Sequence, residues 1–288
     1  MVGPTASGKT ELAIRLAEKL GGEIVSADSV QVYRNFEIGT GKPSAEERAR
    51  ARHYLIDVFD PLEHCDVARF VELADQALAE IRARGRTPIV CGGTFLWVRA
   101  LIYGLAAAPP ADPAVRARHR ELAEREGRAA LHAELARVDP ETAARLSPND
   151  FVRVSRALEV SELSGVPMSR WQAEHGFERP RLRARLLGVA RERGELDQRI
   201  RARAEAMFAA GWIDEVRSLR EQGYGAARAM GCVGYRQIDQ ALASGSPLEL
   251  PALIDAVVRA TRIFARRQRT WLRDQPVEWL PAGALPSV

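Results

Sequence analysis

The hydrophobic positions of the first hundred residues alternate between short apolar runs and longer stretches with helical spacing. Leu12, Leu16 and Leu20 recur every fourth residue, and residues 67–84 show helical spacing again before Gly85. Short apolar runs separate or follow these helices, over residues 23–28, 53–58 and 88–91. Strands that alternate with helices in this way predict a parallel sheet with helices on both faces.

The pattern changes after Gly104. Residues 106–113 are an Ala/Pro linker, and residues 115–138 form a polar helical stretch rich in arginine and glutamate. A new helix is expected to begin at 139–140, and an amphipathic helix is expected over 151–163. A strand over 186–189 is expected to return to the sheet. Residues 195–222 are expected to form a helix or helix pair, and residues 254–271 an arginine-dense helix. We therefore predict the first part of an α/β core at 1–104, a helical insertion at 105–150 and, at 151–288, the rest of the core with a helical C-terminal region.

A motif almost at the N-terminus fits every fixed position of a phosphate-binding P-loop, G-x-x-x-x-G-K-[ST]. It consists of Gly3, Pro4, Thr5, Ala6, Ser7, Gly8, Lys9 and Thr10. Its backbone N–H groups are expected to point at an anion, which also faces the positive end of the helix that follows. Lys9 would neutralise the outer phosphate, and the Thr10 hydroxyl would join the ligands of a phosphate-bound Mg²⁺. The motif predicts a P-loop NTPase-like α/β fold.

Only Met1 and Val2 precede this motif, although a P-loop follows a buried strand. The first strand is therefore expected to be very short, or the chain begins late relative to its relatives.

The composition is that of an ordinary globular protein, with 46% hydrophobic and 28% charged residues. No apolar run approaches the roughly 20 residues needed to cross a bilayer, and no secretory signal precedes the P-loop. Cys65, Cys91 and Cys232 are scattered and odd in number, which argues against a disulfide framework or a zinc site. We expect no membrane association and a cytoplasmic protein.

Asp28 is the candidate carboxylate nearest to the P-loop, because it ends the strand over 23–28, where doubly wound sheets place their ligands. A catalytic role is favoured over the alternative, a cap on the following turn. The strand over 88–91 ends in Gly92-Gly93-Thr94, not in the metal-binding acid of nucleotide hydrolases and motors. Thr94 is a second candidate, with a simple turn hydroxyl as its alternative.

Several motifs, taken in order, resemble the tRNA dimethylallyltransferases, also called tRNA isopentenyltransferases. They are the P-loop; residues 26–33, SADSVQVY; 38–43, IGTGKP; 53–57, HYLID; 92–94, GGT; 139–140, DP; 149–150, ND; 156–160, RALEV; 234–236, GYR; and 267–271, RQRTW. One such segment alone is weak evidence, but together they extend over nearly the whole chain and are specific.

The resemblance implies transfer of a dimethylallyl group from dimethylallyl diphosphate to N6 of adenosine 37, next to the tRNA anticodon. The P-loop and Mg²⁺ would hold the diphosphate leaving group, and Asp28 would act as general base toward the adenine amine. Thr94 would help to hold that geometry. Arg199 and Arg203 both lie where the family places arginines, and Arg203 is favoured as the residue that reaches the diphosphate.

The same resemblance implies contacts with the tRNA anticodon loop. The matching positions are Asp28, Ser29, Val30 and Gln31; Arg116; Val152, Arg153, Val154, Ser155 and Arg156; Gly231, Cys232, Val233, Gly234, Tyr235 and Arg236; and Arg266, Arg267, Gln268, Arg269, Thr270, Trp271, Leu272 and Arg273. Arg116 has an alternative interpretation as a solvated charge on a polar helix. Trp271 is expected in the core rather than stacked on a base.

Five positions depart from the family pattern. Two of them are Ala204 and Glu205, which replace the usual pair of an apolar residue and an acid after Arg203. Phe95 and Trp97 stand where the family usually has glycine and tyrosine, which implies a reshaped channel for the acceptor base. Phe95 is also poorly suited to a left-handed backbone. Val152 replaces a common glutamine and so removes one polar contact to RNA.

Three other functions fit parts of the sequence. A P-loop small-molecule kinase is supported by the N-terminal half alone but needs no basic C-terminal helix. An adenylate isopentenyltransferase acting on free nucleotides would lack the insertion and the arginines of residues 266–273. A non-catalytic RNA-binding protein would not be expected to keep Lys9, Thr10, Asp28 and Thr94. For the favoured transferase we expect a monomer.

Overall fold

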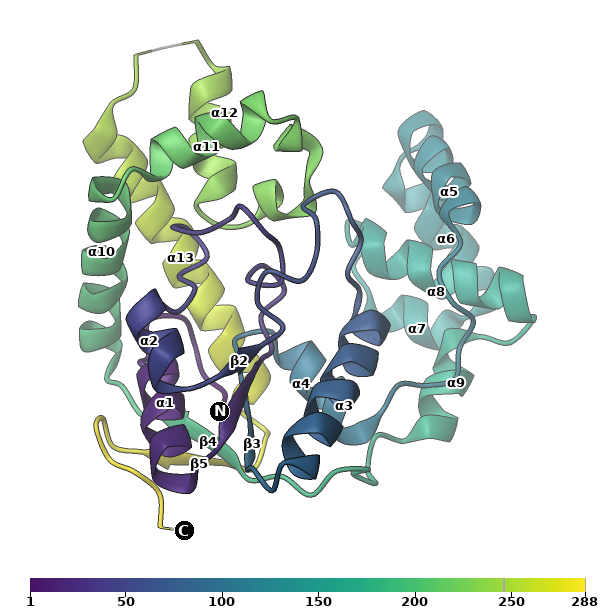
Figure 1. Cartoon of the computed structure of the whole chain (residues 1–288). Coiled ribbons are helices and arrows are strands. Elements are labelled where there is room, and N and C mark those ends of the chain that lie inside the picture. Colours follow the sequence, from purple (N-terminus) through teal and green to yellow (C-terminus); the bar gives the residue numbers. More distant parts are fainter. Residues whose placement is uncertain (246, 288) are drawn as a thin grey trace. The chain divides into compact units, whose positions relative to one another are not determined.

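The computed structural model describes residues 1–245 and 247–287 and divides the chain into two compact units (Figure 1). The larger unit consists of Met1–Ile102 and Arg183–Val288, and the smaller unit is Tyr103–Leu182. The expected insertion over 105–150 is thus too short, because the helices that follow residue 150 belong to the smaller unit.

Parallel strands form the centre of the larger unit. β1 (Glu23–Ser26) lies between β2 (His53–Tyr54) and β3 (Pro88–Cys91), and β4 (Leu186–Val189) pairs with β5 (Val277–Leu280). The parallel sheet with flanking helices is therefore confirmed. The strand expected over 186–189 exists, but it pairs with β5, a strand that the sequence did not indicate.

Met1 and Val2 lie between the two sheets. The backbone N–H of Val2 donates to the carbonyl of Leu187, and Val2 forms a parallel bridge with Gly188. On the other side, the N–H of Gly92 donates to the carbonyl of Met1. The segment before the P-loop thus takes the place of a very short first strand, which is one of the two possibilities considered from the sequence.

The strand predicted over 53–58 is shorter than expected. β2 contains only His53 and Tyr54, because Leu55 and Asp57 adopt positive φ angles of 61° and 60° and turn the chain away from β1. The backbone N–H groups of residues 57–59 then donate to carbonyls of Gln31 and Val32, so this segment supports the loop after β1.

Helices cover the strands because their apolar stripes match the buried face. α1 (Lys9–Leu20) buries Leu12 and Leu16, which join the core of β1, β3, β4 and β5. Each fully buried leucine stabilises the fold by about 1.5–3 kcal/mol. The other helices of this half are α2 (Ala45–Arg50), α3 (Val67–Ala83) and α4 (Phe95–Tyr103).

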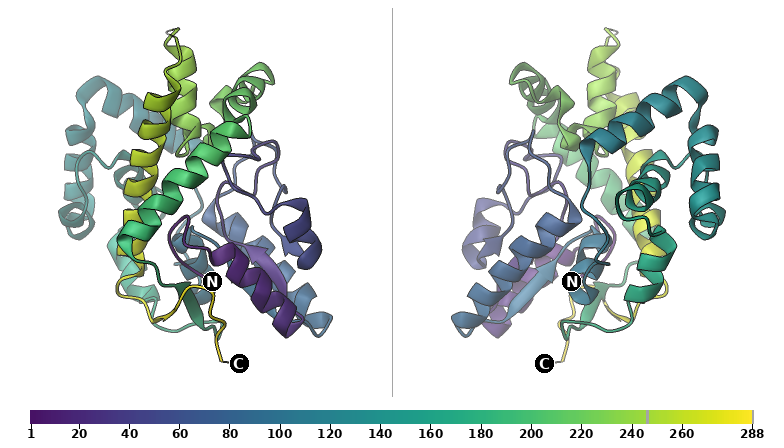
Figure 2. Two further views of the ribbon diagram at one scale, coloured as in Figure 1. Left: turned by 90° about the vertical axis from the view of Figure 1, so that its left-hand side faces the viewer. Right: turned by 90° about the vertical axis from the view of Figure 1, so that its right-hand side faces the viewer.

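The C-terminal part of the larger unit is helical, as predicted. It contains α10 (Arg193–Ala209), α11 (Trp212–Glu221), the 3₁₀ turns η1 (Tyr224–Ala226) and η2 (Arg228–Gly231), α12 (Tyr235–Ala243) and α13 (Leu250–Leu272). A break at Gly211, with φ 94°, makes residues 193–221 a helix pair. α10 and α13 pack side by side (Figure 2). No described helix is both long and apolar enough to span a bilayer.

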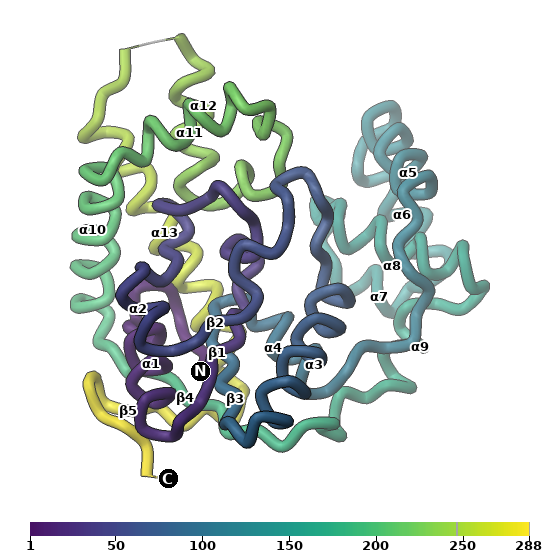
Figure 3. The backbone as a smooth tube through the Cα atoms, in the orientation of Figure 1, coloured from purple at the N-terminus to yellow at the C-terminus, as the bar shows by residue number. Residues whose placement is uncertain are grey.

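The segment between β1 and α2 makes a long excursion toward α11 and α12 (Figure 3). There the backbone N–H of Ile38 donates to Glu215, and the N–H of Gly39 donates to the hydroxyl of Tyr235. Gln31 holds the returning part of this loop, since its Nε2 donates to the carbonyls of Thr40 and Gly41.

The smaller unit is a bundle of short helices. It contains α5 (Pro113–Glu126), α6 (Arg128–Val138), α7 (Pro140–Arg145), α8 (Phe151–Ser164) and α9 (Met168–His175). Its core is formed mainly by Leu131, Leu135, Val154 and Leu158. The stretch predicted over 115–138 is broken into two helices at Gly127, whose φ of 88° favours glycine.

Candidate functional site

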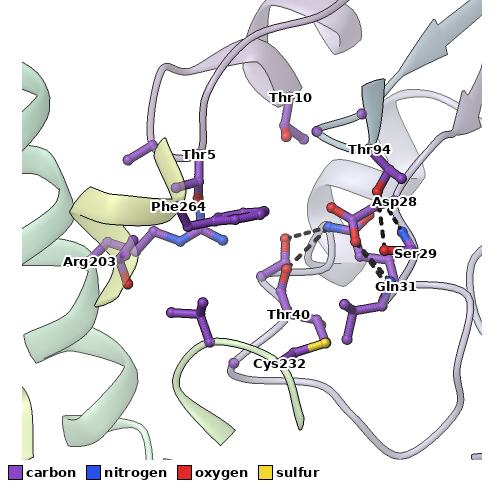
Figure 4. A pocket seen from close by; sticks show the side chains of 18 of the residues that line it. Thr5, Thr10, Asp28, Ser29, Gln31, Thr40, Thr94, Arg203, Cys232 and Phe264 are labelled. Atoms are coloured by element: carbon purple, nitrogen blue, oxygen red, sulfur yellow. Dashed lines mark hydrogen bonds between the residues drawn. The ribbon is translucent and has the colours of Figure 1, made fainter. Parts of the chain in front are cut away.

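A cavity of about 390 Å³ lies within the larger unit. Segments that are distant in the sequence line it, among them the P-loop, the segment after β1, the loop after β3, α10, the region around η2 and α12, and α13. Figure 4 shows side chains from these segments directed at one space. The structure thus brings together residues that the sequence analysis singled out separately.

The P-loop contributes a cationic end to this cavity. Thr5, Ala6, Lys9 and Thr10 line it, whereas Gly3, Pro4, Ser7 and Gly8 of the same motif do not. Gly8 is the N-cap of α1 and offers no side-chain hydrogen bond, so the first-turn N–H groups of the helix are left for a ligand. Burial lowers the pKa of the Lys9 ammonium, which a bound anion would reverse.

Neither Lys9 Nζ nor Thr10 Oγ1 has a hydrogen-bond partner among residues 1–245 and 247–287. Both side chains are therefore available to a ligand in the cavity. An unpaired ammonium and an unpaired hydroxyl at the N-terminus of a helix suit a phosphate or diphosphate group.

Three arginines surround the P-loop, but they are used differently. Arg191 Nε donates to the carbonyl of Ser7 at 3.1 Å, and Arg199 Nε donates to the carbonyl of Ala6 at 2.8 Å. Arg203 lines the cavity, and its Nη1 lies 3.4 Å from Thr5 Oγ1. Of the two arginines considered from the sequence, Arg203 is the one whose side chain borders the cavity.

The surroundings of Arg203 explain the motif at residues 38–43. Gly41 has a φ of 56°, and a Cβ there would lie 1.8 Å from Arg203 Nη2. Only glycine allows this backbone to pass so close to the guanidinium. Burial lowers the pKa of Arg203, and the Asp28 carboxylate opposes that effect. A desolvated guanidinium beside a cavity is prepared to bind an anion.

Asp28 occupies the opposite side of the cavity from Arg203 in Figure 4. Its Oδ1 accepts hydrogen bonds from the N–H groups of Val30 and Gln31 at 3.0 and 3.4 Å. The turn cap considered as an alternative is therefore present. No described residue donates to Oδ2, so one carboxylate oxygen remains free to act on a ligand, and the turn cap does not conflict with the expected catalytic role.

Thr94 follows β3 and lies next to the Asp28 segment. Its Oγ1 accepts a hydrogen bond from the backbone N–H of Ser29 at 3.0 Å and donates to Ser29 Oγ at 3.2 Å. Its own N–H donates to the carbonyl of Ala27. Thr94 is therefore more than a turn residue, because its hydroxyl bonds Ser29 and its N–H bonds Ala27, the residues on either side of Asp28.

An apolar wall of the cavity was missed from the sequence. Ile200 and Met207 lie on α10, and Val257 and Phe264 lie on α13. Their spacing of seven residues, with Arg203 and Thr261 between, places each pair on one helix face. That spacing was visible in the sequence, but it is the same spacing that core residues show. Only the packing of α10 against α13 reveals that these faces border a cavity.

The expected tRNA-contacting residues of the larger unit divide into three groups. Those that line the cavity are Asp28, Ser29, Val30, Gln31, Gly231, Cys232, Val233, Tyr235, Arg236, Arg267 and Gln268. Those that line a second cavity, of about 640 Å³, are Arg266, Arg269, Thr270, Leu272 and Arg273. Gly234 and Trp271 line neither.

Some of these side chains are buried and lie out of reach of a surface partner. They are Tyr235, Gln268 and Leu272. The Tyr235 hydroxyl donates to Glu215 and accepts from Gly39, so it is used inside the protein. For Trp271 the expectation of a core position is wrong, because its side chain is 51% exposed.

The comparisons with known proteins identify the family of this chain. The family profile described as IPP transferase matches residues 31–275. This chain belongs to the IPP transferase family. It is 64% identical to the tRNA dimethylallyltransferase of Sorangium cellulosum, over 99% of this chain and 90% of that protein.

Solved structures of IPP transferases are similar over nearly the whole chain. The tRNA isopentenylpyrophosphate transferase of Bacillus halodurans is 37% identical, with a TM-score of 0.69, over 97% of this chain and 88% of that one. A eukaryotic dimethylallyltransferase described as acting on tRNA is 25% identical, with a TM-score of 0.79, over 98% of this chain and 72% of that one. The resemblance recognised from the motifs is confirmed.

The two departures from the IPP transferase pattern after Thr94 do not reach the cavity. Phe95 begins α4 and does not adopt a left-handed backbone, and both Phe95 and Trp97 are buried. Trp97 stacks on Phe70 with the ring centroids 4.4 Å apart. Neither residue lines the cavity, so the expectation of a reshaped acceptor channel is wrong for these two positions.

The smaller unit contains the remaining residues that the family resemblance assigned to tRNA. Val152 and Arg153 are exposed, but Val154 and Ser155 are buried in the helix bundle. Their side chains therefore hold the bundle together and do not present themselves to RNA.

Arg116 and Arg156 are both tied to one buried carboxylate. Arg116 Nε and Nη2 donate to the two oxygens of Glu159 at 2.9 and 3.0 Å, and Arg156 Nη1 donates to Glu159 Oε2 at 2.5 Å. Glu159 is fully buried. Arg116 is thus neither a freely solvated charge nor an uncommitted RNA contact.

Proposed function

We propose that this protein transfers a dimethylallyl group from dimethylallyl diphosphate to N6 of adenosine 37 in tRNA, with release of diphosphate. Membership in the IPP transferase family and the names of its relatives support this reaction. The observation that carries the proposal is that Lys9, Thr10 and Arg203, which suit a diphosphate, line one cavity together with Asp28, a carboxylate with a free oxygen.

The donor would bind with its diphosphate at the P-loop. The first-turn N–H groups of α1, the Lys9 ammonium and the Arg203 guanidinium would hold the phosphate oxygens. These groups would stabilise the negative charge that develops on the leaving group as the C–O bond breaks. The apolar wall formed by Ile200, Met207 and the α13 face suits the hydrocarbon part of the donor.

The residues present fit a magnesium ion. Thr10 Oγ1 is an unpaired oxygen that borders the cavity, and Mg²⁺ prefers oxygen ligands from one or two side chains together with substrate phosphates. Bound Mg²⁺ would supply charge neutralisation on the diphosphate. We propose Thr10 as a ligand, as the P-loop motif predicts.

The acceptor would be activated at Asp28. As the adenine N6 attacks the allylic carbon, the new C–N bond forms, the C–O bond breaks, and Asp28 Oδ2 accepts the proton that N6 loses. An exocyclic amine is a poor nucleophile, so orientation must contribute much of the rate. The Thr94–Ser29 hydrogen bonds would hold Asp28 in place for this transfer.

The RNA would have to present its base to the cavity. A base stacked in a loop must be flipped out to reach an enclosed site, which costs a few kcal/mol. The lining residues of the segments 28–31 and 231–236, other than the buried Tyr235, are together with Arg267 the proposed contacts to the flipped nucleotide. The exposed arginines of α13 are proposed to bind backbone phosphates. A monomeric state and a cytosolic location remain predictions.

The test is incubation of the purified protein with labelled dimethylallyl diphosphate and Mg²⁺ and one of three acceptors. Undermodified tRNA should take up the label. Free AMP should not, which distinguishes an adenylate isopentenyltransferase. A parallel reaction with ATP and small-molecule acceptors tests the kinase alternative, and turnover there without prenyl transfer to tRNA would refute the proposal.

A further inference from the structure

Gln268 of α13 joins two loops of the cavity. Its Oε1 accepts a hydrogen bond from the backbone N–H of Thr5 at 2.8 Å, and its Nε2 donates one to the backbone carbonyl of Gly93 at 2.9 Å. The partners fix the orientation of the amide, because an N–H needs an acceptor and a carbonyl needs a donor. The side chain therefore bridges the P-loop and the loop after β3.

The bridge is buried and closely fitted. Gln268 is 7% exposed, although its neighbours Arg267 and Arg269 are exposed. A Cβ added at Gly93 would lie 2.5 Å from Gln268 Nε2, so the bridge requires a residue without a side chain at position 93. Because the side chain is buried and each polar atom of the amide already bonds a backbone group of the protein, Gln268 faces the interior and not a surface partner.

The two bridged loops carry the two halves of the proposed reaction. The P-loop carries Lys9 and Thr10, which face the leaving group. The loop after β3 carries Thr94, which holds Ser29 and thereby the segment of Asp28. The amide of Gln268 thus connects the loop that carries Lys9 and Thr10 to the loop that holds the segment of Asp28.

We propose that Gln268 is a positioning residue for the transfer reaction and does not contact tRNA, although it lies in the arginine-rich segment 266–273. The assignment rests on the proposed function and deepens it. Loss of the bridge would release the Thr5 N–H and let the two loops move independently. Since the rate depends on alignment of the amine, the allylic carbon and the leaving group, catalysis should suffer more than RNA binding.

The first variant is Gln268→Met, which has a similar length but neither hydrogen bond. We expect kcat at saturating substrates to fall about ten-fold or more and diphosphate binding to weaken by about five-fold, as for the loss of buried hydrogen bonds. The Kd for tRNA should stay within about two-fold of that of the wild type. The matched control is Arg269→Met. This variant should weaken tRNA binding and reduce the salt dependence of that binding, while the Kd for diphosphate stays unchanged.

Diphosphate binding is measured by calorimetry with inorganic diphosphate and Mg²⁺, and tRNA binding by filter retention at fixed salt. A Gln268→Met protein that loses tRNA affinity but keeps diphosphate affinity and kcat would overturn the assignment, as would one without any change. If this variant does not fold, Gly93→Ala displaces the same amide from the opposite side and should give the same pattern. A wild type that transfers no prenyl group would refute the proposed function, whereas the two binding measurements would still decide the role of Gln268.

Discussion

The hydroxyl of Thr94 accepts a hydrogen bond from the backbone N–H of Ser29 at 3.0 Å and donates one to the Ser29 hydroxyl. Thr94 follows β3 and Ser29 follows β1, so the pair connects the carboxyl ends of two neighbouring strands. Asp28 lies immediately before Ser29 and is therefore held between its own turn and the strand edge. The position of the proposed base depends on this pair.

Replacing Thr94 by valine tests that dependence. Valine keeps the shape of the side chain but leaves the Ser29 N–H without its acceptor, at a cost of about 1–3 kcal/mol. We expect kcat for prenyl transfer to fall about ten-fold, with the Kd for tRNA unchanged. Thr94→Ser restores the hydroxyl and should recover most of the rate. Equal losses in the valine and serine variants would mean that packing of the methyl group, and not the hydroxyl, matters.

Asp28→Asn separates the two roles of Asp28. The asparagine carbonyl still accepts from the N–H of Val30, so the turn is preserved. The amide cannot accept a proton, and we expect kcat to fall about a hundred-fold or more while tRNA affinity is nearly unchanged. Asp28→Ala should abolish transfer and disturb the turn as well. Normal turnover in the asparagine variant would remove Asp28 from the base role.

Much of the site was predictable because it is encoded locally. The P-loop is a contiguous motif, and the stripe of Leu12 and Leu16 behind it predicts α1 without tertiary information. Asp28 and Thr94 could be selected because both follow short apolar runs, and parallel strands bring their carboxyl ends to one edge.

The rest depends on packing between distant segments. Met207 and Phe264 have the spacing of core residues, and only the contact of α10 with α13 makes them line a cavity. Gln268 was grouped with its arginine neighbours, because a sequence does not show which way one helix residue faces across the molecule. Trp271 was expected in the core from its type alone, but its turn of α13 faces solvent.

Arg203→Met tests the proposed diphosphate contact. We expect the KM for dimethylallyl diphosphate to rise about 10- to 100-fold, because the variant loses a charge-assisted hydrogen bond in a desolvated site. The free protein should not lose thermal stability, because burial already disfavours this guanidinium, whose pKa is lowered. The upward shift in Tm on adding diphosphate should shrink instead.

Arg201→Met is the matched control for Arg203→Met. Arg201 lies on the same helix, two residues away, but its Nη2 binds Asp255 on the surface at 2.6 Å. It does not line the cavity, so the KM for the donor should be unchanged. Similar KM increases in both variants would indicate a general effect of positive charge on α10 and would remove the specific role of Arg203.

Glu159→Gln is expected to destabilise the smaller unit in a pH-dependent way. Burial alone would raise the pKa of the Glu159 carboxyl, but hydrogen bonds from Arg116, Arg156 and the N–H of Asp112 outweigh burial and lower the pKa. The unfolded value is about 4.3, so the stabilisation is complete above that pH and is lost as the pH falls through the lower folded value. At pH 7 the variant should lose about 3 kcal/mol, because two arginines lose their charged partner.

The pH dependence distinguishes this buried network from an ordinary surface pair. In urea unfolding followed by circular dichroism, the difference between wild type and Glu159→Gln should narrow as the pH is lowered from 7 toward 3, since the wild-type carboxylate becomes protonated. The control is Glu174→Gln, whose partner Arg170 lies beside it on the surface of α9, and it should have little effect at either pH. A difference for Glu159→Gln that stays constant with pH would show that its cost comes from shape and not from the lost charge.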